Sequence, residues 1–335
     1  MRATLAVFGV ALAVAGAAEA SPPVWFVVFT GGSSRLLVSK GGSWRDATPT
    51  PHPFQIDDVQ FLDSRHGFAA AGSCVSGTEA LYETADVGRT WRRVAALETH
   101  SCNAGATTTI SFINARLGWS TVIEPTASFA RLYRTRDGGR SWKPVRRSLP
   151  LVGAVRFRSA NHGWLTGVFR WPGPMLETRD GGRSFRVRRV RRPAGLQGVA
   201  SYESPVFFGR SGVLATRWGR AAGPRERTSA DAFFRTSNGG RTWTLISTLR
   251  LNPKTDLQTV TPTVWWMASR DAVYVTRDGG SRWRRHPFHI GERPLNVSLT
   301  PLDARTAVLQ TYNEPHRIRW FVTHDSGVTF HRFAP

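Results

Sequence analysis

The chain has 335 residues, of which 45 are Lys or Arg and 23 are Asp or Glu, so its formal net charge is +22. Hydrophobic residues make up 41%, with 13 Trp and 19 Phe, which excludes a disordered polybasic chain because such chains lack the aromatic residues of a packed core. The charge favours binding to nucleic acid or an anionic surface. However, the only lysines are Lys40, Lys143 and Lys254, and arginine without lysine is also a signature of codon composition.

The first twenty residues have the pattern of a secretory signal peptide. Arg2 precedes an uncharged apolar run at 5–18, and Ala18-Glu19-Ala20 is a small-x-small cleavage site. The run is shorter than a membrane span of about 20 residues. We therefore expect a signal peptide at 1–20 and a mature chain, 21–335, without a transmembrane span. This predicts a secreted, periplasmic or envelope-associated protein, and an uncleaved N-terminal anchor is the alternative.

An eight-residue pattern, called here the octapeptide turn, recurs through the rest of the chain. It reads Ser/Thr-x-Asp-x-Gly-x-Thr/Ser-Trp/Phe and returns roughly every 40–60 residues. Intact copies stand at 84–91, 135–142, 178–185 and 323–330. Two more copies carry one substitution each, with Asn238 for the Asp at 236–243 and Arg282 for the hydroxyl residue at 276–283. A shortened copy at 39–44 opens the mature chain.

The octapeptide turn predicts a β-hairpin. Apolar and polar residues alternate before each copy, as at 80–83 and 272–275, which is typical of a strand. An Asp carboxylate can accept backbone N–H bonds inside a turn, and Gly supplies the positive φ that the turn needs. We therefore interpret the central acid or amide of each copy as structural: Asp86, Asp137, Asp180, Asn238, Asp278 and Asp325.

A second motif precedes three of these hairpins. Residues 61–68, 112–119 and 157–164 each place Phe, five further residues, Gly and an aromatic in that order, which predicts two strands joined by a polar turn. Each repeat thus offers four strands, and the sequence predicts an all-β protein, a β-propeller of four-stranded antiparallel blades in one domain, 21–335. We expect seven blades with a thin first unit at 24–29, 36–39 and 43–46, and six blades are the alternative.

The octapeptide turn resembles the Asp-box, or BNR repeat. With the Phe-to-Gly-Trp motif before it, the chain looks like the Asp-box propellers of the photosystem II assembly and stability factor type over roughly residues 24–335. Sialidases, other glycoside hydrolases and sorting receptors also carry the box. The resemblance implies that the box is a blade turn remote from the active face, and it implies protein partners.

The opposite face of a propeller carries the connections between second and third strands and between blades. Cys74 and Cys102 fall in two such connections of the second unit, so with export we expect a disulfide between them rather than two free thiols. The longest connections carry Arg beside Trp, which suits stacking on a ligand or partner; the alternative is that each Trp folds over its own blade edge. The candidate binding residues are Arg170, Trp171, Arg217, Trp218, Arg220, Arg225, Arg227, Tyr312 and His316.

No catalytic set is recognisable in the sequence. The Phe/Tyr-Arg-Ile-Pro signature of sialidases is missing, and Tyr202-Glu203 is a poor pair because neighbouring strand residues face opposite sides. No spacing singles out the two carboxyls of a glycosidase, and we assign Asp57-Asp58 to the start of a strand. His286 and His289 lack a third metal ligand, and phosphate-loop and dinucleotide motifs are absent. We expect neither metal nor cofactor.

Basic runs follow several octapeptide turns, at 92–93, 146–147, 186–192 and 284–285. We assign them chiefly to edge strands, where charge blocks edge-to-edge aggregation, although together they attract anionic partners. The resulting hypothesis is a monomeric, non-catalytic binding or assembly scaffold for protein, carbohydrate or envelope partners, without a dedicated nucleic-acid role. A sialidase-like or other glycoside hydrolase and a lectin-like carbohydrate-binding module are the alternatives.

Overall fold

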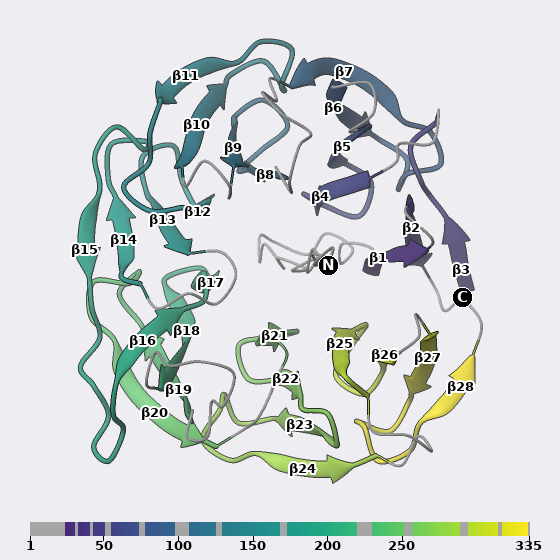
Figure 1. Ribbon diagram of the computed structural model, residues 1–335, viewed down its shortest axis with the longest axis vertical. Coiled ribbons are helices and arrows are strands. Elements are labelled where there is room, and N and C mark those ends of the chain that lie inside the picture. Colours follow the sequence, from purple (N-terminus) through teal and green to yellow (C-terminus); the bar gives the residue numbers. More distant parts are fainter. Residues whose placement is uncertain are drawn as a thin grey trace. The chain divides into compact units, whose positions relative to one another are not determined.

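The computed structural model describes residues 24–30, 33–40, 43–50, 55–73, 78–97, 107–124, 129–167, 173–219, 230–250, 255, 257–288, 294–313 and 317–333. The chain divides into two compact units, Met1–Arg189 and Val190–Pro335. Within the described residues each sheet takes its strands from one continuous stretch of chain, and every strand pair is antiparallel. The fold is a β-propeller of four-stranded blades, as the sequence predicts (Figure 1).

The first unit contains four sheets, numbered here in chain order. Sheet 1 has three strands, β1 (Val24–Thr30), β2 (Ser33–Lys40) and β3 (Ser43–Asp46). Sheet 2 has β4 (Gln55–Phe61), β5 (Gly67–Ser73), β6 (Thr78–Thr84) and β7 (Arg92–Leu97). Sheet 3 has β8 (Thr107–Phe112), β9 (Gly118–Glu124), β10 (Phe129–Thr135) and β11 (Lys143–Arg146). Sheet 4 has β12 (Gly153–Phe157), β13 (Gly163–Gly167), β14 (Met175–Thr178) and β15 (Arg186–Arg188).

The second unit contains three sheets. Sheet 5 has β16 (Val199–Tyr202), β17 (Val206–Phe208), β18 (Ser211–Gly219), β19 (Ala230–Thr236) and β20 (Thr244–Leu249), where the short β17 pairs with β18 beside β16. Sheet 6 has β21 (Gln258–Thr259), β22 (Trp265–Ala268), β23 (Ala272–Thr276) and β24 (Arg284–Pro287). Sheet 7 has β25 (Asn296–Pro301), β26 (Ala307–Asn313), β27 (Arg317–Thr323) and β28 (His331–Phe333).

These assignments give six blades with a full set of four strands and one three-stranded first sheet in the described part of the chain. The thin first unit expected from the sequence is therefore present. The predicted signal peptide lies outside the described residues. Among the residues that are described, no helix has the length and apolar character needed to cross a membrane.

The Phe-to-Gly motif sets the spacing between neighbouring sheets. Phe112 pairs with Gly118 in register, and a Cβ at Gly118 would lie only 2.5 Å from the Phe112 ring. The ring therefore lies over the bare glycine, and the next residue, Trp119, stacks on Phe157 of sheet 4 with centroids 3.7 Å apart. Phe68 likewise stacks on Phe112 of sheet 3 at 3.8 Å. In sheets 2 and 3 the aromatic residue after the glycine thus forms part of the core against the next sheet, whereas Trp164 of sheet 4 packs on His162 of its own sheet.

Candidate functional site

Each octapeptide turn is closed by a hydrogen-bond network of its own side chains. In sheet 3, Asp137 Oδ1 accepts from the Ser141 N–H at 2.9 Å, and Asp137 Oδ2 accepts from the Ser141 hydroxyl at 2.5 Å. The Thr135 hydroxyl donates to Asp137 Oδ1 at 2.7 Å and accepts from the Gly139 N–H at 2.8 Å, where Gly139 has a φ of 87°. The same arrangement recurs around Asp86, Asp180, Asn238 and Asp325, and Asp278 keeps the backbone part of it.

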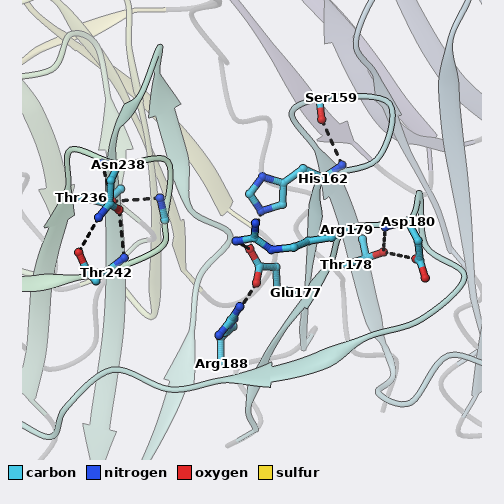
Figure 2. A network of polar contacts seen from close by, with 11 residues as sticks. Ser159, His162, Glu177, Thr178, Arg179, Asp180, Arg188, Thr236, Asn238 and Thr242 are labelled. Carbon is cyan, nitrogen blue, oxygen red and sulfur yellow. Dashed lines mark hydrogen bonds and ion pairs between the residues drawn. The ribbon is translucent and has the colours of Figure 1, made fainter.

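These turn carboxylates are held ionised by their hydrogen bonds. The Ser141 hydroxyl and N–H lower the pKa of Asp137 to about 2. Burial raises the pKa of Asp180, but the hydrogen bonds from Ser184 and Thr178 outweigh it and bring the pKa to about 2. Asn238 builds the same turn with a neutral amide, because its Nδ2 donates to the Thr242 hydroxyl at 2.8 Å (Figure 2). The turn therefore needs the hydrogen bonds rather than the charge.

Two of the predicted binding residues, Arg217 and Trp218, are strand residues of β18 and not loop residues, so their assignment to a connection is wrong. The Trp218 side chain is buried, and its indole N–H donates to the Thr216 hydroxyl at 2.8 Å. Arg217 Nε lies 3.3 Å from the fully buried carboxylate of Asp231, the residue opposite it on β19. The strand extends through Gly219 because it is paired with β16 and β19 as far as residues 217–219 and 217–218, respectively. Of the two alternatives for Trp218, the structure shows the packed one.

Of the other predicted binding and disulfide residues, the structure describes Tyr312 alone. Tyr312 lies half-buried on β26, where it pairs with Asn296 of β25. The remaining ones lie outside the described residues and stay predictions: Arg170, Trp171, Arg220, Arg225, Arg227, His316, Cys74 and Cys102.

Buried acids on β4 were not singled out as a site by the sequence. Asp57 Oδ2 accepts from the Thr108 N–H at 2.8 Å, and Asp58 Oδ2 accepts from the Ile110 N–H at 2.9 Å. Farther along β4, Gln60 Oε1 accepts from the Phe112 N–H at 2.7 Å. These side chains therefore satisfy alternate N–H groups on the edge of β8, which has no ladder partner on that side.

A bulge brings the two neighbouring acids to the same side of the strand. The register of β4 against β5 shifts between Ile56 and Asp58, so Asp57 is the extra residue. Arg156 of β12 completes the group, with its Nη1 2.9 Å from Asp58 Oδ2. The three first strands β4, β8 and β12 of this unit are thus joined through side chains.

Asp57 is also hydrogen-bonded to the buried Glu79 of β6. Burial raises the pKa of Asp57 to about 6, although hydrogen bonds from the Thr108 N–H, Glu79 and Gln55 lower it. Below about pH 6 the Asp57 carboxyl is therefore protonated and can donate its proton to Glu79. A glycosidase holds its carboxyls about 5–10 Å apart across a cleft, so this directly bonded, buried pair has a structural role.

Sheet 4 holds a second charged cluster, around Glu177 of β14 (Figure 2). Arg188 Nε lies 2.6 Å from Glu177 Oε2, while Arg179 Nη2 and His162 Nε2 lie 2.8 and 2.6 Å from Oε1. Burial raises the pKa of Glu177, but the hydrogen bonds from Arg179, Arg188 and His162 keep it below the usual value. Burial likewise lowers the pKa of His162. Glu177 is therefore a carboxylate paired with two arginines and hydrogen-bonded to an imidazole.

A pocket of about 570 Å³ opens beside the octapeptide turn of sheet 3. It is lined by Asn114, Ala115, Arg116, Leu117, Arg134 and Arg136. Asn114 shapes the floor, because its Oδ1 accepts the N–H groups of Arg116 and Leu117 at 2.9 and 2.8 Å. The lining contains three arginines and no acid. Among the described residues, no group of three or more His, Cys, Asp or Glu could hold a metal ion.

Comparison with known proteins supports the fold. No protein-family model matches the chain, and no curated protein matches it in sequence. Among solved structures it is similar to a GH74 xyloglucanase from Xanthomonas campestris, with 16% identity and a TM-score of 0.58 over 98% of this chain and 54% of that chain. The chain therefore spans about half the length of that enzyme.

Two further structures resemble the chain. An oligogalacturonate lyase in complex with manganese has 10% identity and a TM-score of 0.57, covering 92% of this chain and 88% of that one. YCF48 bound to D1 peptide has 17% identity and a TM-score of 0.38, covering 84% and 93%. At these identities the likeness to the two enzymes shows the propeller fold alone. The YCF48 superposition is too loose to carry an argument.

Proposed function

We propose that this protein is an exported, non-catalytic binding scaffold whose basic surface docks an acidic partner protein. The observation that carries the proposal is that the acidic side chains are hydrogen-bonded within the fold, whereas many arginines are exposed at the surface. Sixteen acidic side chains in the described part of the chain each accept a hydrogen bond from the chain itself. These acids close turns, satisfy strand edges or pair with buried arginines, so they are engaged within the fold.

The arginines, in contrast, are concentrated on exposed outer strands and the residues after them. Arg92 and Arg93 begin β7, Arg284 and Arg285 begin β24, and all four are exposed. Arg92 pairs with Glu83 and Arg285 with Asp271, whereas Arg93 and Arg284 add to the excess of positive charge. The stretch at 186–192 adds exposed Arg186, Arg189, Arg191 and Arg192. Such a surface attracts negatively charged partners over about 8–10 Å at physiological ionic strength. The same arginines can protect strand edges from aggregation and attract a partner. The net charge of +22 favours attraction of a partner as their role.

Export and a disulfide belong to the same proposal. Ser73, next to Cys74, pairs with Thr78, and Leu97 at the end of β7 pairs with Glu79. The strand ends that lead to Cys74 and Cys102 therefore lie at the same end of sheet 2, which supports a bridge across that end. An exported protein meets the oxidising conditions that such a bridge requires.

The test compares binding with turnover on the purified mature chain, 21–335. Fluorescence anisotropy with labelled hexaglutamate should show saturable binding that weakens about tenfold or more between 50 and 300 mM salt. Labelled hexaglutamine should not bind, and a double-stranded DNA of equal charge should bind no more tightly than the peptide. Turnover of fluorogenic sialosides or other glycosides would contradict the proposal in favour of a hydrolase. Glycan binding without peptide binding would favour a lectin-like module instead.

A further inference from the structure

The pocket beside the octapeptide turn of sheet 3 is lined in part by Arg134, an arginine whose Nε is buried without an acceptor. Arg134 lies on β10 opposite Trp119, and its guanidinium carbon is 5.1 Å from the Trp119 ring centroid. Its Nε is fully buried, and no acceptor of the described chain lies within hydrogen-bond distance of that atom. Burial lowers the pKa of Arg134, and the nearby cations Arg136 and Arg183 lower it further. A buried donor without an acceptor costs stability, so the position calls for an explanation.

The repeats supply an internal comparison for this position. The residue that pairs with the aromatic after the motif glycine is Glu83 in sheet 2, opposite Phe68, and Glu177 in sheet 4, opposite Trp164. Each of these glutamates is neutralised within its own sheet, Glu83 by Arg92 and Glu177 by Arg179, Arg188 and His162. In sheet 3 the equivalent residue is Arg134. The sign of the central charge is therefore reversed.

One neighbouring cation is the same in sheets 3 and 4, although the central charge differs in sign. Arg136 stands two residues after Arg134, as Arg179 stands two residues after Glu177. Arg116 lines the same pocket, and no carboxylate in the described part of the chain pairs with any of these three arginines. Of the groups that hold Glu177 in sheet 4, sheet 3 thus keeps the counterpart of Arg179, which is Arg136; it adds Arg116 and lacks the carboxylate.

Sheet 5 shows that an arginine at this position does not by itself require a counter-charge. Arg235 occupies it, paired with Val213, but Arg235 is exposed to solvent. Sheets 6 and 7 carry Val275 and Val322 there. Arg134 differs from all of these because it combines positive charge, partial burial and a pocket large enough for a ligand.

We propose that this pocket binds a side-chain or C-terminal carboxylate of a partner protein, with Arg134, Arg136 and Arg116 as donors. The inference rests on the proposed scaffold function and names the chemistry of one docking point. The carboxylate would take, from outside the chain, the place that Glu177 fills from inside it in sheet 4. There Arg179 already binds a carboxylate oxygen at 2.8 Å, which is the length of a charge-assisted hydrogen bond. The pocket volume of about 570 Å³ admits an acidic side chain with part of its backbone.

The experiment compares Arg134→Gln with Arg235→Gln in the hexaglutamate titration. Both variants remove one positive charge from the same repeat position, so a general electrostatic attraction weakens equally in both. We expect Arg134→Gln to weaken binding about tenfold or more, because it removes charge-assisted hydrogen bonds, and Arg235→Gln to weaken it less than about twofold. Arg134→Glu should abolish binding and should also raise the melting temperature, since Arg136 then gains an internal partner.

The possible outcomes separate the two proposals. If the wild-type chain does not bind hexaglutamate, the scaffold proposal fails. If it binds but Arg134→Gln and Arg235→Gln behave alike, the scaffold proposal survives and the pocket assignment is overturned. Inorganic phosphate and acetate serve as competitors: displacement by phosphate at concentrations where acetate is inert would assign the pocket to free phosphate and overturn the carboxylate. Should Arg134→Gln fold poorly, the exposed Arg136→Gln provides the same comparison.

Discussion

The adjacent acids Asp57 and Asp58 predict opposite effects of the same chemical change. Asp57 is buried, its carboxyl is hydrogen-bonded to Glu79, and its pKa is raised to about 6. In an unfolded chain an Asp titrates near 3.9. Keeping Asp57 ionised in the folded protein above pH 6 therefore costs about 3 kcal/mol, at about 1.4 kcal/mol for each pKa unit.

The sign of the pH effect follows from the raised pKa. The folded state binds the proton more tightly than the unfolded state, so the contribution of Asp57 to stability is fully present below about pH 4 and is lost as pH rises through about 6. Asp57→Asn removes the charge but keeps an oxygen that can accept the Thr108 N–H bond, now 2.8 Å long. We expect the variant to be about 1–3 kcal/mol more stable than wild type at pH 8 and close to wild type at pH 4.

Asp58→Asn is the matched control one residue away. Asp58 accepts from the Ile110 N–H and forms an ion pair with Arg156 at 2.9 Å. Neutralising it leaves a half-buried guanidinium without its partner, which destabilises the protein by about 2–4 kcal/mol. The assay is urea denaturation between pH 4 and pH 8, read as the free energy of unfolding. The reasoning is refuted if Asp57→Asn destabilises at pH 8, or if its stability keeps the wild-type decrease between pH 4 and pH 6.

Three further predictions follow from the fold. Asp137→Asn should cost less than about 1 kcal/mol, because Asn238 builds the same turn, whereas Asp137→Ala should cost about 1–3 kcal/mol; equal losses in urea denaturation would contradict this. In the folded protein, Asp137, Asp180 and Asp325 have pKa values lowered to about 2, so these carboxylates stabilise the fold only while they are ionised. The free energy of unfolding should therefore decrease as pH falls from about 4 towards 2, and a constant value over that range would contradict this prediction. Gly118→Ala should cost about 1–3 kcal/mol from the clash with Phe112, and Phe112→Leu should relieve part of that loss in the double variant; additive losses would show that the ring contact is not the cause.

The repeating frame of the molecule was predictable because it depends on local rules. Asp and Gly at fixed spacing make the turn, Phe and Gly make the close contact between strands, and neither needs knowledge of distant residues. The three-stranded first sheet could be anticipated for the same reason. Arg217 and Trp218 were misplaced because β18 continues through them, paired with β16 and β19, and the register that brings Arg217 opposite Asp231 is not visible in the sequence.

The candidate site depended on register and could not be identified directly. Arg134 becomes notable only when it is compared with Glu83 and Glu177 at the same paired position and its buried Nε is known. An alignment of the repeats with one another would have shown the reversed charge, but not the pocket. The role of Asp57 and Asp58 depends on a bulge in β4, and no residue in that strand predicts a bulge from the sequence.

The most direct test of the scaffold account is the hexaglutamate titration of the mature chain at low and high salt, with hexaglutamine as the neutral control. The account predicts saturable, salt-sensitive binding of hexaglutamate and no binding of hexaglutamine. Absence of hexaglutamate binding at low salt would contradict it, as would turnover of a glycoside substrate.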